Sequence, residues 1–291
     1  MVAVVVDAAP KRPPARGRLE RQEPGKFRRT PVRSRLNNIL RRVTPLVPTA
    51  RKILAKVGIS VTRTGALYDP IDSDFWDIYR RCSPYTGSSI ERMYGLFKGI
   101  EYIVNAGIDG AIVECGVERG GSMMAAAHTL RHFGDETRDL YLYDTFAGMT
   151  RPTEHDADFR GSPPMQQWQA AERADHNEWL YVPLERVRTN MFATGYPREH
   201  IHFIKGKVED TIPGNSPDRI ALLRLDTDWY ESTYHEMVHL FPLLAQRGVL
   251  LIDDYGHWRG ARDAVDQYLR EDGDAILLNR LDQTGVIALK A

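Results

Sequence analysis

From residue 111 onward, short apolar runs alternate with longer segments of helical periodicity, and this alternation restricts the fold more than any other feature of the sequence. The apolar runs are 111–115, 140–143, 201–204, 220–225, 249–252, 275–278 and 286–289, and the helical segments between them are 120–133, 182–194, 230–246 and 258–271. Strands and helices that alternate in this way form a parallel sheet covered by helices on both faces. The sequence therefore predicts an α/β fold.

The last two apolar runs depart from this pattern, because only residues 279–285 separate them. That connection is too short for a crossover helix, so the two runs are expected to pair as an antiparallel hairpin. A seven-stranded, mostly parallel sheet with an antiparallel last strand and helices on both faces is the architecture of the Rossmann-like class I methyltransferases. We expect this fold.

The charge of the chain is unevenly distributed. The whole sequence has 39 basic and 39 acidic residues, but residues 1–65 contain 16 Lys and Arg against 3 Asp and Glu. We expect a Pro- and Arg-rich arm over 1–65, with short amphipathic helices in 36–59, and a methyltransferase domain over 66–291 that begins with a helical cap, 66–108. The arm is either a solvated or dimer-packing element or a peripheral contact to an anionic membrane or polyanion. We expect a homo-oligomer and no nucleic-acid partner.

The lengths of the apolar runs and the number of cysteines indicate where in the cell the protein is located. No stretch approaches the roughly 18 to 20 consecutive apolar residues that a membrane-spanning helix needs. The opening run Val2–Val6 is too short for a signal peptide and follows no basic segment. Cys82 and Cys115 are the only cysteines, which excludes a disulfide framework and a Cys-rich zinc site. We therefore expect the protein in the cytoplasm.

The first apolar run leads into a glycine-rich loop. Residues 114–122 read Glu-Cys-Gly-Val-Glu-Arg-Gly-Gly-Ser, and their glycines let the backbone turn tightly beside a ligand before a helix begins. The spacing G-x-x-x-G-G differs from the G-x-G-x-x-G of dinucleotide sites and favours a cofactor without a pyrophosphate. Glu114 is then available to the amino-acid part of S-adenosylmethionine. A purely structural strand-to-helix turn is the alternative.

The residues that follow the second and third apolar runs are candidates for binding the nucleoside part of the cofactor. Asp144 follows the glycine loop by roughly 20 to 30 residues, the distance at which an acid can accept both ribose hydroxyls. Residues 205–210 end the third run, where Gly206 and Glu209 are candidates for the wall around the adenine. Glu209 and Asp210 could instead cap a short helix.

The fourth and fifth apolar runs each end in two acids. Asp226 and Asp228 follow the fourth run, and Asp253 and Asp254 follow the fifth. Neighbouring strands would bring these carboxylates together, and clustered carboxylates repel one another unless a cation or a proton relieves them. Oxygen ligands with open water positions suit a hard divalent ion such as magnesium. Capping of the following helices is the alternative.

Four segments together resemble the macrocin O-methyltransferase family: 112–117 (IVECGV), 144–149 (DTFAGM), 223–233 (LRLDTDWYEST) and 252–258 (IDDYGHW). The resemblance covers roughly residues 68–291 and does not include the basic arm. It implies an O-methyltransferase that depends on S-adenosylmethionine and Mg²⁺ and acts on a sugar hydroxyl of a glycoside or glycan. The acceptor, whether a secondary-metabolite glycoside or a cell-surface glycan, stays open.

The resemblance also implies roles for individual residues. By motif position, the metal ligands would be Asp226, Asp253 and Asp254, the general base Asp228, and the cofactor residues Glu114, Gly116, Ser122 and Asp144. Residues 147–180 would form a lid over the substrate. His257 is a second candidate base, since imidazole titrates near neutral pH, or else a supporting group behind the site. Glu118 departs from the family, which usually has an aromatic residue there.

A competing motif lies in residues 235–239, which match the H-E-x-x-H of zinc peptidases. On a helical wheel the apolar stripe consists of Tyr234, Met237, Val238, Phe241, Leu244 and Ala245, which turns both histidines toward solvent. Pro242 disturbs this helix and no third ligand is evident. We therefore favour a solvated helical face over a zinc peptidase. A non-catalytic nucleoside- or glycan-binding protein on the same fold is the remaining alternative, against which the intact carboxylates argue.

Overall fold

The computed structural model describes residues 71–272 and 276–291. The chain divides into two units, Met1–Asp69 and Pro70–Ala291, and every described residue belongs to the second. The predicted basic arm, 1–65, and its membrane contact therefore lie outside the described residues. Within the described ranges, no helix combines the length and the hydrophobicity needed to cross a bilayer.

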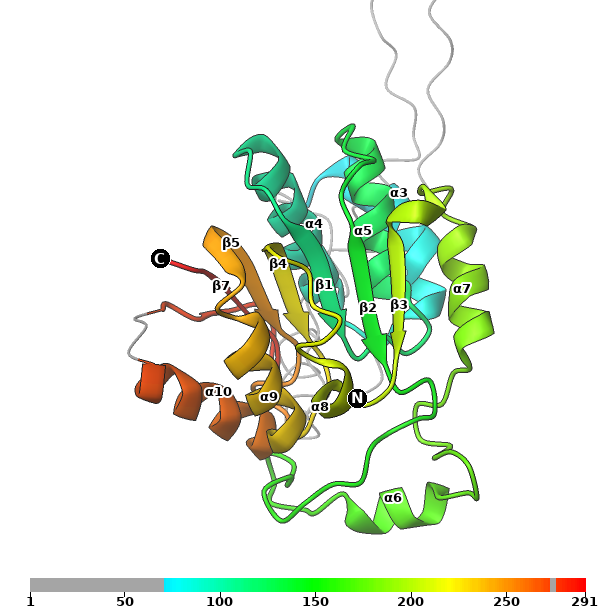
Figure 1. Cartoon of the computed structure of the whole chain (residues 1–291), viewed down its shortest axis with the longest axis vertical. Coiled ribbons are helices and arrows are strands. Elements are labelled where there is room, and N and C mark those ends of the chain that lie inside the picture. Colours follow the sequence, from blue (N-terminus) through cyan, green and yellow to red (C-terminus); the bar gives the residue numbers. More distant parts are fainter. Residues whose placement is uncertain (1–70, 273–275) are drawn as a thin grey trace, which may run out of the picture. The chain divides into compact units, whose positions relative to one another are not determined.

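The described part of the chain is built on a seven-stranded sheet with the order β3-β2-β1-β4-β5-β7-β6 (Figure 1). The strands are β1 Ala111–Cys115, β2 Leu140–Asp144, β3 Ile201–Lys205, β4 Ile220–Leu225, β5 Leu244–Ile252, β6 Asn279–Arg280 and β7 Val286–Leu289. Neighbours among β1 to β5 pair in parallel, whereas β7 is antiparallel to both β5 and β6. The predicted class I methyltransferase fold is confirmed.

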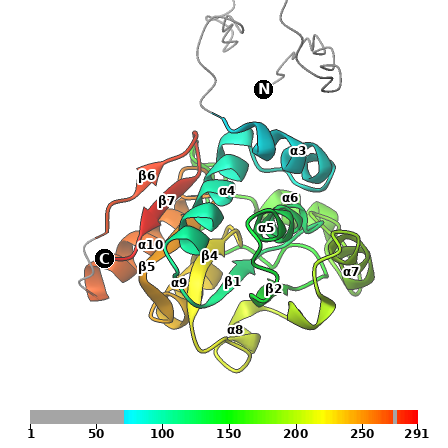
Figure 2. The same cartoon turned by 90° about the horizontal axis from the view of Figure 1, so that it is seen from above.

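Helices cover both faces of this sheet, as Figure 2 shows from above. They are α3 Ser73–Cys82, α4 Ile90–Asn105, α5 Gly121–His132, α6 Met165–Ala171, α7 Leu184–Phe192, α8 Val208–Thr211, α9 Tyr230–Leu240 and α10 Arg259–Asp272, with 3-10 turns η1 Ser83–Tyr85 and η2 Arg198–His200. The helical segment expected upstream of the sheet is thus two helices, α3 and α4, and Pro84 lies in the turn between them. Figure 1 shows α6 beyond the carboxyl ends of the parallel strands.

The two faces of the sheet form separate apolar cores. Along β5, Val249 and Leu251 pack into the core beneath α3, α4, α5 and α7, whereas Leu250 and Ile252 pack into the core shared with α9 and α10. This alternation follows from the two-residue period of a strand, which sends successive side chains to opposite faces. A strand buried on both faces reads as a continuous apolar run, which explains the sequence pattern.

The structure corrects the predicted helix 230–246. Helix α9 ends at Leu240, and β5 begins already at Leu244 rather than at residue 249. Pro242 has no backbone N–H to donate to a helix and its ring clashes with the preceding turn, so the helix cannot continue through it. The apolar residues assigned to the end of the helix belong to the strand instead.

The predicted strand 275–278 is also misplaced. The strand that pairs with β7 is β6, Asn279–Arg280, within the segment expected to be the hairpin loop. The Asp282 carboxylate accepts hydrogen bonds from the backbone N–H groups of Thr284 (2.8 Å) and Gly285 (2.7 Å), which makes the turn tight. A shorter turn moves the paired strand toward residue 280, so the antiparallel pairing was predicted correctly but its position was not.

The burial pattern makes a stability prediction. Leu222 on β4 is fully buried, whereas Leu277 is 75% exposed. Replacing Leu222 by Ala removes buried methyl groups and leaves a cavity, so the free energy of unfolding should fall by about 2 to 5 kcal/mol. The matched change Leu277→Ala should alter it by less than about 0.5 kcal/mol. Urea unfolding of the full chain measures both, and equal effects would contradict the difference in burial between the two leucines.

Candidate active site

The carboxyl ends of β1, β2, β4 and β5 surround a cavity of about 270 Å³. The cavity is lined by the glycine loop, by the acids that follow β4 and β5, and by residues 85–88, which precede α4. A smaller cavity of about 70 Å³ adjoins it and shares Gly116, Asp144 and Asp226 in its wall. Ligands of open parallel sheets bind at this edge, so the location agrees with the sequence prediction.

Gly116 is where the glycine loop meets the acidic turn after β4. Its φ is +83°, and a Cβ atom at this position would lie 2.0 Å from the backbone oxygen of Asp226. The N–H of Gly116 donates to Tyr143 (2.9 Å), and the N–H of Asp226 donates to the oxygen of Cys115 (2.8 Å). Only glycine fits this conformation and this contact, so the glycine loop lies directly against the acidic turn that follows β4.

Asp144 holds the glycine loop in place. Its Oδ2 accepts hydrogen bonds from the N–H groups of Val117 (2.8 Å) and Glu118 (3.1 Å), and its Oδ1 accepts one from Phe146 (2.6 Å). Burial raises the pKa of this carboxyl, and the three N–H donors oppose that rise. Asp144 lines both cavities, and Glu118, the departure from the family, supplies a backbone donor with a φ of +48°.

Glu114 is a buried acid on β1 with one oxygen engaged. It is 1% exposed, its Oε1 accepts a hydrogen bond from Arg224, and its Oε2 has no hydrogen-bond partner among the described residues. Burial raises the pKa of Glu114 to about 7, against the lowering effect of the Arg224 guanidinium. A buried carboxylate oxygen without a donor suits a ligand that brings one, such as an ammonium group.

Arg224 connects several of these groups from within β4. Its Nη1 donates to both Glu114 and Asp226 (2.7 Å), and its Nη2 donates to Ser88 (2.9 Å) and Asp253. Arg92 on α4 donates to the other oxygen of Asp253. Neither arginine is predicted from the sequence, although Arg224 is a charged residue inside the apolar run 220–225 and was therefore a usable signal.

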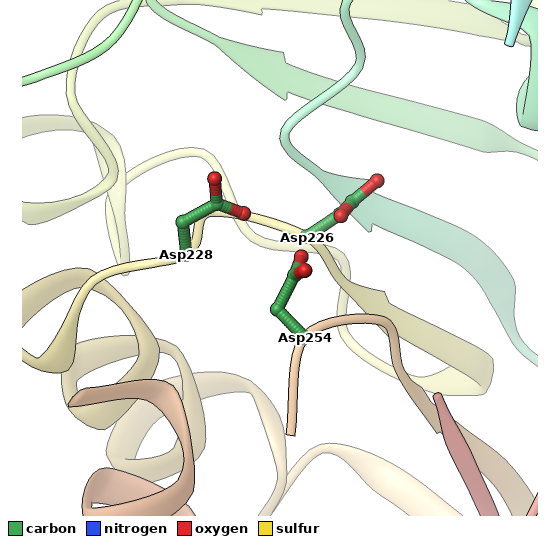
Figure 3. A group of neighbouring side chains, drawn as sticks. All are labelled: Asp226, Asp228 and Asp254. Carbon is green, nitrogen blue, oxygen red and sulfur yellow. The ribbon is translucent and has the colours of Figure 1, made fainter. Parts of the chain in front are cut away.

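Three carboxylates lie together between the ends of β4 and β5. Asp226, Asp228 and Asp254 each offer an oxygen within 4.8 Å of the others, and Figure 3 shows the three side chains converging. Burial, reinforced by the neighbouring carboxylates, holds the pKa of Asp226 and Asp254 well above their usual range, and burial raises that of Asp228 to about 7. Three oxygen donors that repel one another at this spacing fit a hard divalent cation.

This group differs from the predicted ligand set. The structure includes Asp228, which the sequence analysis expected to be the base, and turns Asp253 toward Arg92 and Arg224. Asp228 has a φ of +72°, a conformation that directs its side chain back toward Asp226 rather than into α9. All four predicted acids thus lie at the same edge of the sheet, but in two different environments.

The remaining cofactor candidates line the two cavities. Ser122 is buried at the start of α5 in the wall of the larger cavity. Gly206 and Glu209 line the smaller one, where the Oε2 of Glu209 is buried without a hydrogen-bond partner in the described chain. The predicted cofactor residues are therefore brought together by the fold.

His257 lies apart from the cavity. It is half-buried, its ring packs against Trp258 (4.7 Å between centroids) and Phe159 (5.8 Å), and it is not among the residues that line the cavity. Burial lowers its pKa. The structure does not place this imidazole against the acid cluster, so a role beside the site fits it better than proton transfer.

The segment predicted as a lid, 147–180, is anchored at several points beside the site. The indole of Trp229 donates to the oxygen of Thr150 (2.9 Å), and the buried carboxylate of Asp156 accepts from the N–H of Tyr230 (2.8 Å). Met149 and Leu180 line the larger cavity, and Leu180 is 48% exposed. Two ends of the segment therefore contribute to the cavity wall.

The zinc-peptidase motif is not a metal site. The rings of His235 and His239 contact one another at a tilt of 55° (4.3 Å between centroids), and the Nε2 of His235 lies 3.0 Å from the backbone oxygen of Ile212. Both histidines are half-buried, not solvated as expected, because the chain after α8 packs against this side of α9. Glu236 points elsewhere: it is fully buried and accepts from the hydroxyl of Thr227 (3.2 Å).

The chain is similar to known O-methyltransferases. The family model described as Macrocin-O-methyltransferase (TylF) matches residues 79–290. A relative from Streptomyces olivaceus, "8-demethyl-8-(2,3-dimethoxy-alpha-L-rhamnosyl)-tetracenomycin-C 4'-O-methyltransferase", is 35% identical over 69% of this chain and 74% of its own. "Demethyldecarbamoylnovobiocin O-methyltransferase" from Streptomyces niveus is 31% identical over the same shares.

A solved structure of the O-methyltransferase NovP has a TM-score of 0.63 at 28% identity and covers 71% of this chain and 82% of its own. The calicheamicin methyltransferase CalS11, at 16% identity and a TM-score of 0.53, covers 79% and 99% and shares the fold. The family match spans well over half of the chain, and the residues that carry it lie around one cavity. The protein is therefore an O-methyltransferase that belongs to the macrocin-O-methyltransferase (TylF) family.

Proposed function

We propose that this enzyme transfers a methyl group from S-adenosylmethionine to a sugar hydroxyl of a glycoside, at a site that holds a divalent cation. The observation that carries the proposal is the group formed by Asp226, Asp228 and Asp254, which adjoins the cavity of the glycine loop. The names of the tetracenomycin, novobiocin and mycinamicin relatives support a small glycosylated acceptor.

The cofactor would occupy both cavities. Gly116 and Ser122 line the larger cavity and leave room for its amino-acid part. Glu114 directly precedes this loop on β1, and its unpartnered Oε2 would accept a hydrogen bond from the ammonium group. Asp144 lies between the cavities, at the position expected for the ribose, and Gly206 and Glu209 would surround the adenine in the smaller one. The buried, unpartnered oxygen of Glu209 supports this, since adenine carries an amino donor.

Asp226 and Asp254 would hold the cation, with Mg²⁺ the expected ion. When bound, it would supply Lewis acidity that lowers the pKa of the acceptor hydroxyl. Asp228 would accept the proton of that hydroxyl, because it lies within reach of both ligands and its raised pKa suits a base near neutral pH. Asp253, the third predicted ligand, could reach the cation only after releasing an arginine.

The acceptor would lie between the acid group and the segment 147–180. Trp179, Trp229 and Trp258 pack together beside this segment, with ring centroids 4.9 to 6.2 Å apart. Phe159, 59% exposed, and Leu180 offer apolar surface beside it. We propose this segment as the cover over the acceptor. The homo-oligomer, the cytoplasmic location and the role of the basic arm stay predictions.

Incubation with labelled S-adenosylmethionine, Mg²⁺ and a panel of deoxysugar glycosides tests the function directly. We expect label in a sugar O-methyl group of at least one glycoside, identified by mass spectrometry and NMR of the product. Transfer only to an aglycone hydroxyl or to a protein side chain would contradict the sugar assignment. Binding of neither S-adenosylmethionine nor S-adenosylhomocysteine in calorimetry would contradict the methyltransferase chemistry itself.

Replacing the base should separate rate from binding. In Asp228→Asn we expect turnover to fall by about 10²- to 10⁴-fold, because the amide cannot accept the proton, with cofactor affinity little changed. The exposed acid Asp109 lies just before β1, at the amino ends of the parallel strands and away from the site. It provides the matched control Asp109→Asn, whose turnover should equal that of the unmodified enzyme. Unchanged turnover in Asp228→Asn would discard the assignment.

Titration with Mn²⁺, followed by electron paramagnetic resonance, tests the ligands. Asp226→Asn should weaken Mn²⁺ binding by about 10- to 100-fold or more, since it removes a direct ligand. Asp253→Asn should weaken it far less, because both oxygens of Asp253 face arginines. An equal loss in the two variants would show that Asp253 leaves its arginines to bind the cation.

A further inference from the structure

We propose that Arg224 is a positioning residue that couples the cofactor site to the cation site, so that each ligand tightens the binding of the other. The inference rests on the proposed function, since it needs both ligands. The observation behind it is that one nitrogen, Nη1 of Arg224, donates to Glu114 of the cofactor site and to Asp226 of the cation site. The two acids therefore share one donor group.

The fold holds Arg224 in this position. Glu114 and Arg224 are direct neighbours in the register of β1 and β4. The second nitrogen, Nη2, is fixed by Ser88 (2.9 Å) and Asp253. The side chain is only 6% exposed, so water cannot replace a lost partner easily. The guanidinium therefore has little freedom to move. What can change is how strongly its Nη1 group interacts with Glu114 relative to Asp226.

A cation at the acid group would change that division. A cation bound to Asp226 neutralises part of its negative charge, so the attraction between Asp226 and Arg224 becomes weaker. The guanidinium of Arg224 then interacts more strongly with Glu114. Glu114 accepts only through Oε1, and its buried Oε2 has no partner among the described residues. A more firmly held Glu114 keeps Oε2 oriented for the ammonium group of the cofactor. Cation binding should therefore favour cofactor binding, and linkage requires the reverse effect to be equal.

Calorimetric titration of the full-length enzyme tests the coupling. The dissociation constant of S-adenosylhomocysteine is measured without metal and at saturating MnCl₂, and that of Mn²⁺ with and without S-adenosylhomocysteine. We expect each ligand to tighten the other by about fivefold or more, with the same factor in both directions. S-adenosylhomocysteine has an uncharged sulfur, so simple repulsion between cations cannot hide the effect. A coupling below roughly twofold, or of the opposite sign, overturns the proposal.

The variant Arg224→Lys identifies the route of coupling. A lysine keeps the positive charge but lacks the fork that serves two acids from fixed positions. We expect both ligands still to bind, with the coupling reduced to roughly twofold or less. The matched control is Arg138→Lys, in which the coupling should be unchanged. Arg138 is a half-buried arginine just before β2, at the amino ends of the parallel strands, and it pairs with Asp135. Coupling retained in Arg224→Lys overturns the proposal.

The outcomes separate this proposal from the proposed function. If the unmodified enzyme binds neither S-adenosylhomocysteine nor Mn²⁺, the proposed function fails. If it binds both and methylates a glycoside without coupling, only the role of Arg224 fails. Circular dichroism establishes whether Arg224→Lys folds. Should it not fold, the reciprocal measurement on the unmodified enzyme still decides, since it requires no variant.

Discussion

The charge balance at the carboxyl edge of the sheet is the constraint on which the rest of the site depends. Six acids lie there: Asp144, Asp226, Asp228, Asp253 and Asp254 line the larger cavity, and Glu114 is buried on β1. Buried carboxylates repel one another. Arg92 and Arg224 offset part of this charge, and backbone N–H groups satisfy Asp144. The group of Asp226, Asp228 and Asp254 is the least compensated: Arg224 pairs with one oxygen of Asp226, and within the described residues no arginine or lysine pairs with Asp228 or Asp254. The residual negative charge thus lies where the proposed reaction would use a cation.

Backbone contacts link that charge to the cofactor cavity. Gly116 approaches the backbone oxygen of Asp226 so closely that no side chain fits between them. The glycine loop and the acidic turn are therefore one rigid unit, although 110 residues separate them in sequence. A shift of either segment would move both the cofactor wall and the acids. Such an arrangement holds reacting groups in fixed relative positions, which is a large part of what an enzyme contributes to a two-substrate transfer.

The sheet and the position of the site could be predicted from the sequence, because the same local pattern occurs at each parallel strand. Apolar runs of strand length that end in Glu, Gly or Asp predict both a parallel sheet and the edge at which its ligands bind. The errors arose where a single residue overrides periodicity: Pro242 ends α9 early, and Asp282 tightens the hairpin that positions β6. The contacts of Arg92 and Arg224 could not be predicted from sequence patterns, since these contacts join residues that are far apart in the sequence and meet only in the folded chain.

The histidine motif on α9 is a case in which a sequence pattern is present but the fold does not form the site that the pattern predicts. Spacing alone places His235 and His239 on one side of a helix, but a catalytic zinc site also needs a third ligand and a glutamate that faces the same space. Here the chain after α8 covers the histidines, and Glu236 points into the core toward Thr227. Thr227 lies between Asp226 and Asp228, so the buried glutamate supports the turn that presents those two acids. A motif match describes a helix, whereas the neighbours of that helix decide its chemistry.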